Sequence, residues 1–252
     1  MTYAVLPGCE PFSFTGSSSG VLVLHGFTGN PSSMRPLADR LANAGYSVEL
    51  PRLPGHGTAI EDILTTTWSD WSGTALSAFD ELAARTERVC VVGLSMGGAL
   101  TAFVAEQRDG VAGCVFINPL IKPPVPELMA LLDDALASGL SVFDDGGAPD
   151  IKKPGADELA YAGWPLPALK SLVSNLPTVG AALGTITASS LVITSREDHT
   201  VPTDNSLDLV AALAGPVEHI WLDDSYHVAT IDNDQELVEL STLSFVERVL
   251  GA

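Results

Sequence analysis

The 252 residues suffice for one large α/β domain or two small ones, and a hydrophobic content of 46% allows a sizeable core and argues against disorder. A formal net charge of −19, with 12 basic against 31 acidic residues, argues against nucleic acid or anionic lipid as a partner, because basic residues must neutralise phosphates. Three irregularly spaced cysteines, the lack of a signal-like N-terminus and the lack of a membrane-length apolar run predict a cytoplasmic protein with no stable membrane anchor.

Short apolar runs, which predict buried strands, alternate with segments of helical periodicity along most of the chain. The predicted strands cover residues 21–26, 46–51, 87–93, 113–119, 189–195 and 217–223. The predicted helices cover residues 31–45, 66–86, 96–110, 203–215 and 234–251, with a capping-box spacing at Thr67 and Asp70. Such alternation predicts a mostly parallel sheet with helices on both faces, whose ligands bind beyond the carboxyl ends of the strands.

One interval, from about residue 120 to 188, breaks this alternation. It contains the stretches PPVP, DDGGAP, KKPG and WPLP together with short helical pieces, and it has no clear buried strand. A structureless loop of that length is rare inside a compact domain. We therefore predict an α/β core formed by residues 1–119 and 189–252, with residues 120–188 forming a helical cap and the return to the core.

The residues at the predicted strand ends carry the chemistry. Gly93, Ser95 and Gly97 spell G-x-S-x-G, and they lie between a predicted strand and a predicted helix. That context is typical of a nucleophile elbow, in which a sharp turn exposes a serine hydroxyl above the sheet. Ser95 is thus the candidate nucleophile, and the backbone N–H of Met96 at the helix N-terminus is a candidate oxyanion donor.

A serine hydroxyl needs a base and an acid, which in this type of fold follow the nucleophile in the order acid, then histidine. His227 lies in a loop after the last predicted strand and is the preferred base, with His199 and His219 as alternatives by chain order. Asp198 follows the preceding strand and is the preferred acid, with Glu197 as the alternative. Asp223 and Asp224 lie just before the base, where we expect solvated turn residues.

The second oxyanion donor is expected in the turn after the first buried strand, which reads HGFTGN. The backbone N–H of Phe27 is the candidate group, since Gly26 and Gly29 allow a close approach of the main chain. His25 is expected to shape this loop.

Several long motifs occur together with these residues, in one order along the chain. They are HGFTGNPSSMRPLADRLANAGYSVELPRLPGHGT, WSDW, GLSMGGAL, DELAY, SREDHTVP and SYHVATIDND. With them, the chain resembles the bacterial monoacylglycerol lipase and carboxylesterase group of the α/β-hydrolase superfamily. The resemblance implies an α/β-hydrolase fold, with a mostly parallel sheet flanked by helices and a small helical cap inserted after the sixth strand.

For the site, the resemblance implies the same triad of Ser95, Asp198 and His227, with the same two oxyanion donors. It also implies that Glu158, within the DELAY motif, contacts a glycerol head group; a solvated carboxylate or a helix cap is the alternative. The stretches DDGGAPDIKKPG and YAGWPLP depart from the group's pattern, and the cap shapes the pocket. The preference for glycerol therefore depends on the cap of this chain.

These residues predict a serine carboxylic-ester hydrolase that acts on monoacylglycerols or other short-to-medium acyl esters through an acyl-enzyme. A small-molecule ester is the expected partner, and no metal or organic cofactor is required. The acyl chain is expected near Leu128, Leu131 and Leu132 in the cap.

Alternative enzymes with the same triad are a general carboxylesterase, a thioesterase, a carbon–carbon hydrolase and a haloperoxidase-like enzyme. A non-enzymatic ligand-binding protein is an alternative of another class. A dehalogenase or an epoxide hydrolase would need a carboxylate in place of Ser95.

Overall fold

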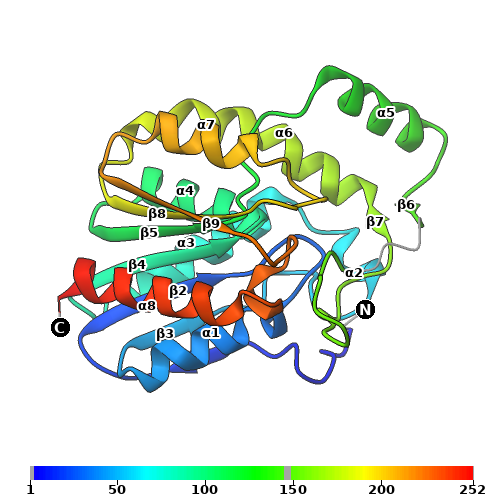
Figure 1. The fold of residues 1–252 in the computed structure, drawn as a ribbon. Helices are drawn as coiled ribbons and strands as arrows, with labels where there is room; N and C mark the ends of the chain where they lie inside the picture. The colour runs from blue at the N-terminus through cyan, green and yellow to red at the C-terminus, as the bar shows by residue number, and fades with distance from the viewer. Residues whose placement is uncertain (1–2, 145–148, 252) are drawn as a thin grey trace.

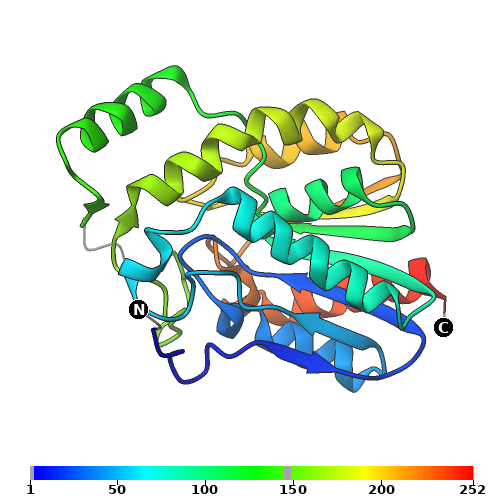
Figure 2. The ribbon, with the colours of Figure 1, turned by 180° about the vertical axis from the view of Figure 1, so that it is seen from behind.

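A seven-stranded sheet runs through the centre of the protein, with helices on both faces (Figures 1 and 2). The computed structural model describes residues 3–144 and 149–251. The strand order is β1-β3-β2-β4-β5-β8-β9, and all neighbouring strands are parallel except β1, which pairs antiparallel with β3. The strands are β1 (Phe12–Phe14), β2 (Ser19–Leu24), β3 (Ser47–Leu50), β4 (Arg88–Leu94), β5 (Val111–Ile117), β8 (Ser189–Ser195) and β9 (Val217–Leu222).

Two helical layers cover this sheet, and each layer encloses its own apolar cluster. One layer holds α1 (Pro31–Asn43) and α8 (Gln235–Leu250). The other holds α3 (Trp68–Ala83), α4 (Met96–Gln107), α6 (Leu166–Ala182) and α7 (Asp204–Ala212). The central strands are buried on both faces because their apolar residues meet helices on either side, which explains their near-continuous apolar sequence.

The local signals in the sequence correspond closely to the elements observed. β8 has the predicted bounds, and each of the other five predicted strands lies within two residues of an observed one. The Asp70 carboxylate accepts a hydrogen bond of 2.9 Å from the Thr67 backbone N–H, as the predicted capping box requires. Gly45, with φ of 95°, follows the C-terminus of α1 in the left-handed conformation that favours glycine. The three-residue edge strand β1 and the short helix α2 (Ile60–Ile63) were not predicted, because neither is long enough to show a periodicity.

The cap leaves the sheet after β5, which is the fifth strand in chain order, so its predicted position after a sixth strand is wrong for this chain. The reason is that only one strand, β1, precedes the buried strand β2 in the described part of the chain. The cap contains α5 (Pro126–Ala137), which projects from the body of the molecule (Figure 1). It also contains the two-residue strands β6 (Val142–Phe143) and β7 (Trp164–Pro165), which pair with each other.

The return from the cap to the sheet is made by α6, which packs against α3 and α4 and belongs to the core layer. It is followed by the 3₁₀ turn η1 (Leu183–Thr185) and then by β8. Part of the predicted DDGGAP loop, residues 145–148, lies outside the described residues. None of the described helices is both long enough and apolar enough to cross a membrane.

Candidate active site

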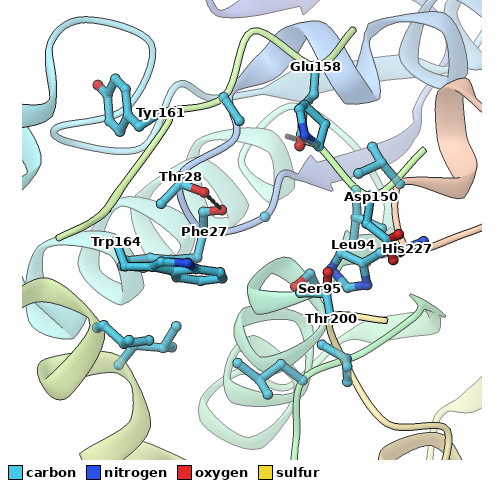
Figure 3. Close-up of a pocket in the computed structure, with 18 of the residues that line it drawn as sticks. Phe27, Thr28, Leu94, Ser95, Asp150, Glu158, Tyr161, Trp164, Thr200 and His227 are labelled. Atoms are coloured by element: carbon cyan, nitrogen blue, oxygen red, sulfur yellow. Dashed lines mark hydrogen bonds between the residues drawn. The ribbon is translucent and has the colours of Figure 1, made fainter. Parts of the chain in front are cut away.

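Ser95 occupies a sharp turn between β4 and α4, at the carboxyl end of the central strand. Its φ and ψ of 57° and −117° are strained for a residue with a side chain. The turn is held by the Ser95 backbone, whose N–H donates to the Ile117 carbonyl at 3.0 Å and whose carbonyl accepts from Gly98 at 2.8 Å. The side-chain hydroxyl has no hydrogen-bond partner among the described residues, and it faces a pocket that His227 also lines (Figure 3). This geometry is that of the predicted nucleophile elbow.

The two glycines of the motif are required by the space around this turn. A Cβ atom at Gly93 would overlap the Gly97 carbonyl, and a Cβ at Gly97 would overlap the carbonyl of Leu24. The main chains of β2, β4 and α4 therefore meet at distances that no other residue type permits. This close contact brings the loop after β2 against Ser95, where an oxyanion donor has to lie.

His227 and Asp198 form a hydrogen-bonded pair, and His227 lines the same pocket as Ser95. The Nδ1 atom of His227 lies 2.8 Å from the Asp198 Oδ2, and both side chains are almost fully buried. The other carboxylate oxygen, Oδ1, accepts hydrogen bonds of 2.9 and 2.7 Å from the backbone N–H groups of Thr200 and Val201. These two donors fix the carboxylate, and the carboxylate in turn fixes the imidazole with its Nε2 atom free for chemistry.

The pKa of His227 is set by two opposing effects. Burial lowers it, because the charged imidazolium loses contact with water, whereas the hydrogen bond and the charge of Asp198 raise it. The carboxylates of Glu158 and Asp150 also raise it, and the result is a pKa above the ordinary value of 6.5. The surroundings of His227 therefore favour the protonated form of its ring.

The predicted oxyanion donors are the backbone N–H groups of Phe27 and Met96. Phe27 follows β2 and lines the same pocket, and Met96 is the first residue of α4. Neither backbone N–H has an acceptor among the described residues, and the first N–H groups of a helix have no intrahelical acceptor by geometry. A Cβ at Gly26 would lie 3.3 Å from the Cβ of Ser95, so the loop and the serine are in direct contact.

His25 holds the loop after β2 through hydrogen bonds, as the sequence indicated. Its Nδ1 lies 2.9 Å from the Gly26 carbonyl, and its Nε2 accepts a hydrogen bond of 3.1 Å from the Leu53 backbone N–H. This pattern requires a neutral ring with its proton on Nδ1. Burial lowers the pKa of His25 well below its ordinary value, so the ring keeps this state at neutral pH. A fixed tautomer holds the loop in one conformation.

Asn118, which the sequence did not point to, joins the end of β8, just before Asp198, to the loop of His227. Its Nδ2 donates to the His227 carbonyl at 2.7 Å and to the Ser195 hydroxyl at 3.0 Å, and its Oδ1 accepts from the Ser195 N–H at 2.7 Å. Its φ of 42° is unusual for a residue with a side chain. The only signal in the sequence is a polar residue directly after a buried strand, and this does not show which loops it contacts.

The alternative site residues lie elsewhere. The exposed His199 pairs with Asp150, and His219 lies in β9 with its Nε2 2.9 Å from the Thr194 hydroxyl. Glu197 is also exposed and pairs with Lys152. The carboxylates predicted to be solvated, Asp223 and Asp224, are exposed and pair with Arg196 and Lys152. The structure brings none of these side chains to Ser95.

A cavity of about 340 Å³ lies between the strand ends and the cap (Figure 3). Ser95, His227 and Glu158 line it together with a mostly apolar wall that includes Phe27, Leu120, Leu128, Trp164, Leu169, Leu172 and Val173. Of the cap leucines predicted near an acyl chain, only Leu128 lines the cavity. Leu132 packs into the core, and Leu131 is 66% exposed, so its predicted place is wrong. The cause is the phase of α5, which turns this residue toward solvent.

Glu158 reaches the same cavity from the cap. Its main-chain carbonyl accepts hydrogen bonds from Asn30 Nδ2 at 3.3 Å and from the Ser32 hydroxyl at 3.1 Å, so it is fixed to the N-terminus of α1. Its carboxyl group lies over Gly29, where a Cβ atom would overlap Oε1. Burial raises the pKa of this carboxyl to about 7, while the positive charge of His227 and a hydrogen bond from Ser33 oppose the rise. Near neutral pH the group is therefore divided between its two protonation states.

Comparison with known proteins agrees with this fold. Residues 21–240 match the model of the alpha/beta hydrolase family. The chain belongs to the α/β hydrolase family. Among curated α/β hydrolases, it is 38% identical to the thermostable monoacylglycerol lipase of Bacillus sp. (strain H-257), over 99% of this chain and 98% of that protein. It is 26% identical to a carboxylesterase of Bacillus subtilis (strain 168), over 95% and 97% of the two chains.

Solved structures extend the comparison of this α/β hydrolase. A structure reported with the metagenome-derived lipolytic enzymes LipS and LipT is 41% identical, has a TM-score of 0.91 and covers 97% of this chain and 100% of its own. A monoacylglycerol lipase from Paleococcus ferrophilus, at 19% identity and a TM-score of 0.79, covers 98% of each chain and shares the fold.

Proposed function

We propose that the protein is a serine carboxylic-ester hydrolase that acts on monoacylglycerols or other short-to-medium acyl esters. The observation that carries this proposal is His227, which is paired with the buried Asp198 and lines one cavity together with Ser95, a serine in a sharp strand-to-helix turn. The names of the lipase and carboxylesterase relatives support the same chemistry.

The unpaired, buried thiols of Cys9, Cys90 and Cys114 support the cytoplasmic location expected from the sequence, since disulfides are rare in reducing compartments.

The proposed reaction has two steps. The Ser95 hydroxyl attacks the ester carbonyl while His227 Nε2 takes its proton, and Asp198 stabilises the imidazolium that results. The backbone N–H groups of Phe27 and Met96 hold the negative oxygen of the tetrahedral intermediate. The imidazolium then protonates the leaving alcohol, which gives an acyl-serine, and a water molecule activated by the same histidine releases the acid.

The apolar and polar parts of the cavity lining suit the two halves of such a substrate. The apolar wall formed by the cap and α6 suits an acyl chain, because burying each methylene contributes about 0.8 kcal/mol. Glu158 supplies a buried polar group in the same cavity, which suits the hydroxyl groups of a glycerol. A carboxyl near its midpoint of protonation can both donate and accept a hydrogen bond.

The first test is hydrolysis by the purified protein of p-nitrophenyl esters of increasing chain length and of monoacylglycerols. We expect turnover by the wild type and a loss of several orders of magnitude in kcat for Ser95→Ala, whose missing hydroxyl cannot form the acyl-enzyme. Full activity of this variant would overturn the mechanism.

The second test concerns the alcohol. If Glu158 binds glycerol, Glu158→Gln should lower kcat/KM for monoacylglycerols by about tenfold, since a hydrogen bond to a charged or strongly polar group contributes about 1.5 kcal/mol, and should leave p-nitrophenyl esters less affected. Glu127→Gln, which changes an exposed carboxylate of the same cap, is the matched control. Equal loss on both substrates would favour a general carboxylesterase, the function named for the Bacillus subtilis relative.

A further inference from the structure

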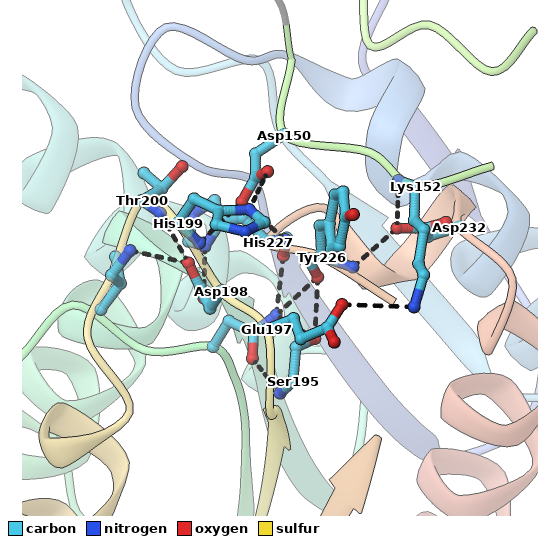
Figure 4. A network of polar contacts seen from close by, with 12 residues as sticks. Asp150, Lys152, Ser195, Glu197, Asp198, His199, Thr200, Tyr226, His227 and Asp232 are labelled. Atoms are coloured by element: carbon cyan, nitrogen blue, oxygen red, sulfur yellow. Dashed lines mark hydrogen bonds and ion pairs between the residues drawn. The ribbon is translucent and has the colours of Figure 1, made fainter. Parts of the chain in front are cut away.

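Asp150, a residue of the cap, contacts the loops of both the acid and the base (Figure 4). Its carboxylate Oδ2 accepts hydrogen bonds from the backbone N–H of His227 at 3.2 Å and from that of His199 at 2.9 Å. Its Oδ1 lies 2.8 Å from the His199 ring, and its main-chain carbonyl accepts from Val228 at 3.1 Å. One side chain thus spans the cap, the loop that follows Asp198 and the loop that carries the base.

The segment that follows is fixed to the loop of the base as well. The backbone N–H groups of Lys152 and Lys153 donate to the two carboxylate oxygens of Asp232, each at 2.8 Å. Asp232 is fully buried, and it also accepts a hydrogen bond of 2.8 Å from the Tyr226 backbone N–H. The cap is therefore anchored on both sides of His227, and Asp150 is held at a constant place relative to the imidazole.

We infer that Asp150 is a positioning residue, whose carboxylate fixes the main chain of His227 against the loop of Asp198 and so couples the cap to the triad. This role in catalysis rests on the proposed ester hydrolysis, whereas the contacts of Asp150 are observed independently of it. Asp150 would affect the rate through geometry. A displacement of about 1 Å in a reacting group can reduce a rate by about 100-fold, and Asp150 restrains both loops that determine where the Nε2 atom lies.

The charge of Asp150 gives this role a signature that a purely structural tether would lack. The carboxylates that face the His227 imidazole are Asp198, which bonds Nδ1, and Glu158 and Asp150, which both come from the cap. Without the negative charge at position 150, the His227 imidazolium is less stable, and the pKa of His227 should fall. The side chain of Asp150 is only 16% exposed, so solvent screens this effect incompletely.

The test is an NMR titration of the His227 Cε1–H signal in the wild type, Asp150→Asn and Asp223→Asn, with a His227 variant used only to assign the signal. Asparagine has nearly the shape of aspartate, but it removes the charge and replaces one of the two acceptor oxygens with an NH₂ group. We expect Asp150→Asn to lower the pKa of His227 by roughly 0.5 unit and kcat/KM by about tenfold. Asp223→Asn removes an equal charge from an exposed residue that pairs with Arg196, and should change neither quantity.

Asp150→Glu, measured beside Asp150→Asn, separates the effect of the charge from the effect of the backbone contacts. It should restore the His227 pKa toward that of the wild type but leave kcat/KM low, because the longer side chain cannot make the same backbone contacts. The inference would be overturned if Asp150→Asn kept both the His227 pKa and the kcat/KM of the wild type. If the asparagine variant failed to fold, a wild-type kcat/KM in Asp150→Glu would overturn it. An inactive wild type or an active Ser95→Ala would instead overturn the proposed function, and the titration would still test Asp150.

Discussion

Individual residues around His227 determine the protonation state of its ring. The ring is buried, which by itself would keep it neutral and make it a weaker base, and three carboxylates reverse this effect. Asp198 alone bonds the ring, while Glu158 and Asp150 act through their charge. The same burial that would weaken the base also strengthens these interactions, because little water separates the charges.

The first prediction at this scale concerns pH. His227 must be neutral to take the proton of Ser95, and its pKa is raised, so activity should disappear as the pH falls through a value above 6.5. A profile of kcat/KM against pH with a stable ester measures this midpoint. An acid limb centred below 6.5 would contradict the raised pKa.

The second prediction separates the two candidate acids. Asp198→Asn should lower kcat by about 10⁴-fold, because the amide cannot stabilise the imidazolium and can favour the wrong tautomer. Glu197→Gln should have little effect on kcat, since this neighbouring side chain is exposed and pairs with Lys152. Comparable losses in the two variants would show that the pairing seen here is not the one used in catalysis.

Among the elements, the crossing of β2, β4 and α4 imposes the strictest limit on sequence. The carbonyl groups of Leu24 and Gly97 occupy the space where side chains would begin, so the elbow can form only with glycine at two positions. In the proposed mechanism, stability and catalysis would depend on the same contact, because it sets the position of the loop after β2 relative to Ser95.

Two glycine-to-alanine variants should therefore change stability in opposite directions. Gly97→Ala forces a Cβ against the β2 backbone and should lower the free energy of unfolding by about 1–3 kcal/mol, with loss of activity. Gly73→Ala in α3 meets no atom within 4 Å and should raise it by about 0.5–1 kcal/mol, since alanine favours the helix. Urea titration followed by circular dichroism measures both values, and a Gly97→Ala protein as stable and active as the wild type would refute the steric argument.

For the whole molecule, the formal charge of −19 is the dominant surface property. Carboxylates outnumber basic side chains by more than two to one, so mutual repulsion opposes the compact state at low salt. The screening length falls from about 30 Å at 0.01 M salt to about 10 Å at 0.1 M, which removes most of this repulsion.

Added salt should therefore raise the melting temperature at neutral pH by several degrees between about 0.01 and 0.5 M sodium chloride. Differential scanning calorimetry measures the shift, and potassium chloride at equal ionic strength should give the same result if screening is the cause. A melting temperature that stays constant or falls would indicate that ion pairs such as Arg196–Asp223 outweigh the repulsion.

The sequence was informative where structure depends on neighbours along the chain. Apolar runs predicted the central strands, and the turn before α4 showed where Ser95 would lie, because both signals are local. The contacts that Asn118 and Asp150 make with His227 join residues 109 and 77 positions apart, and a single sequence does not show which distant residues meet. Leu131 illustrates the same limit, since the phase of α5 depends on what packs beneath it.

The connection from β5 to β8 affects which parts of the sequence can be replaced without disturbing the sheet. The two strands are neighbours in the sheet, and α6 alone suffices as the helical crossover between them. We therefore propose that the segment from α5 to β7 is an insertion at one loop, whose replacement would leave the strand order and register of the seven-stranded sheet unchanged. Substrate range could diversify by replacement of this segment, and any replacement would have to supply a new carboxylate for the loop of the base.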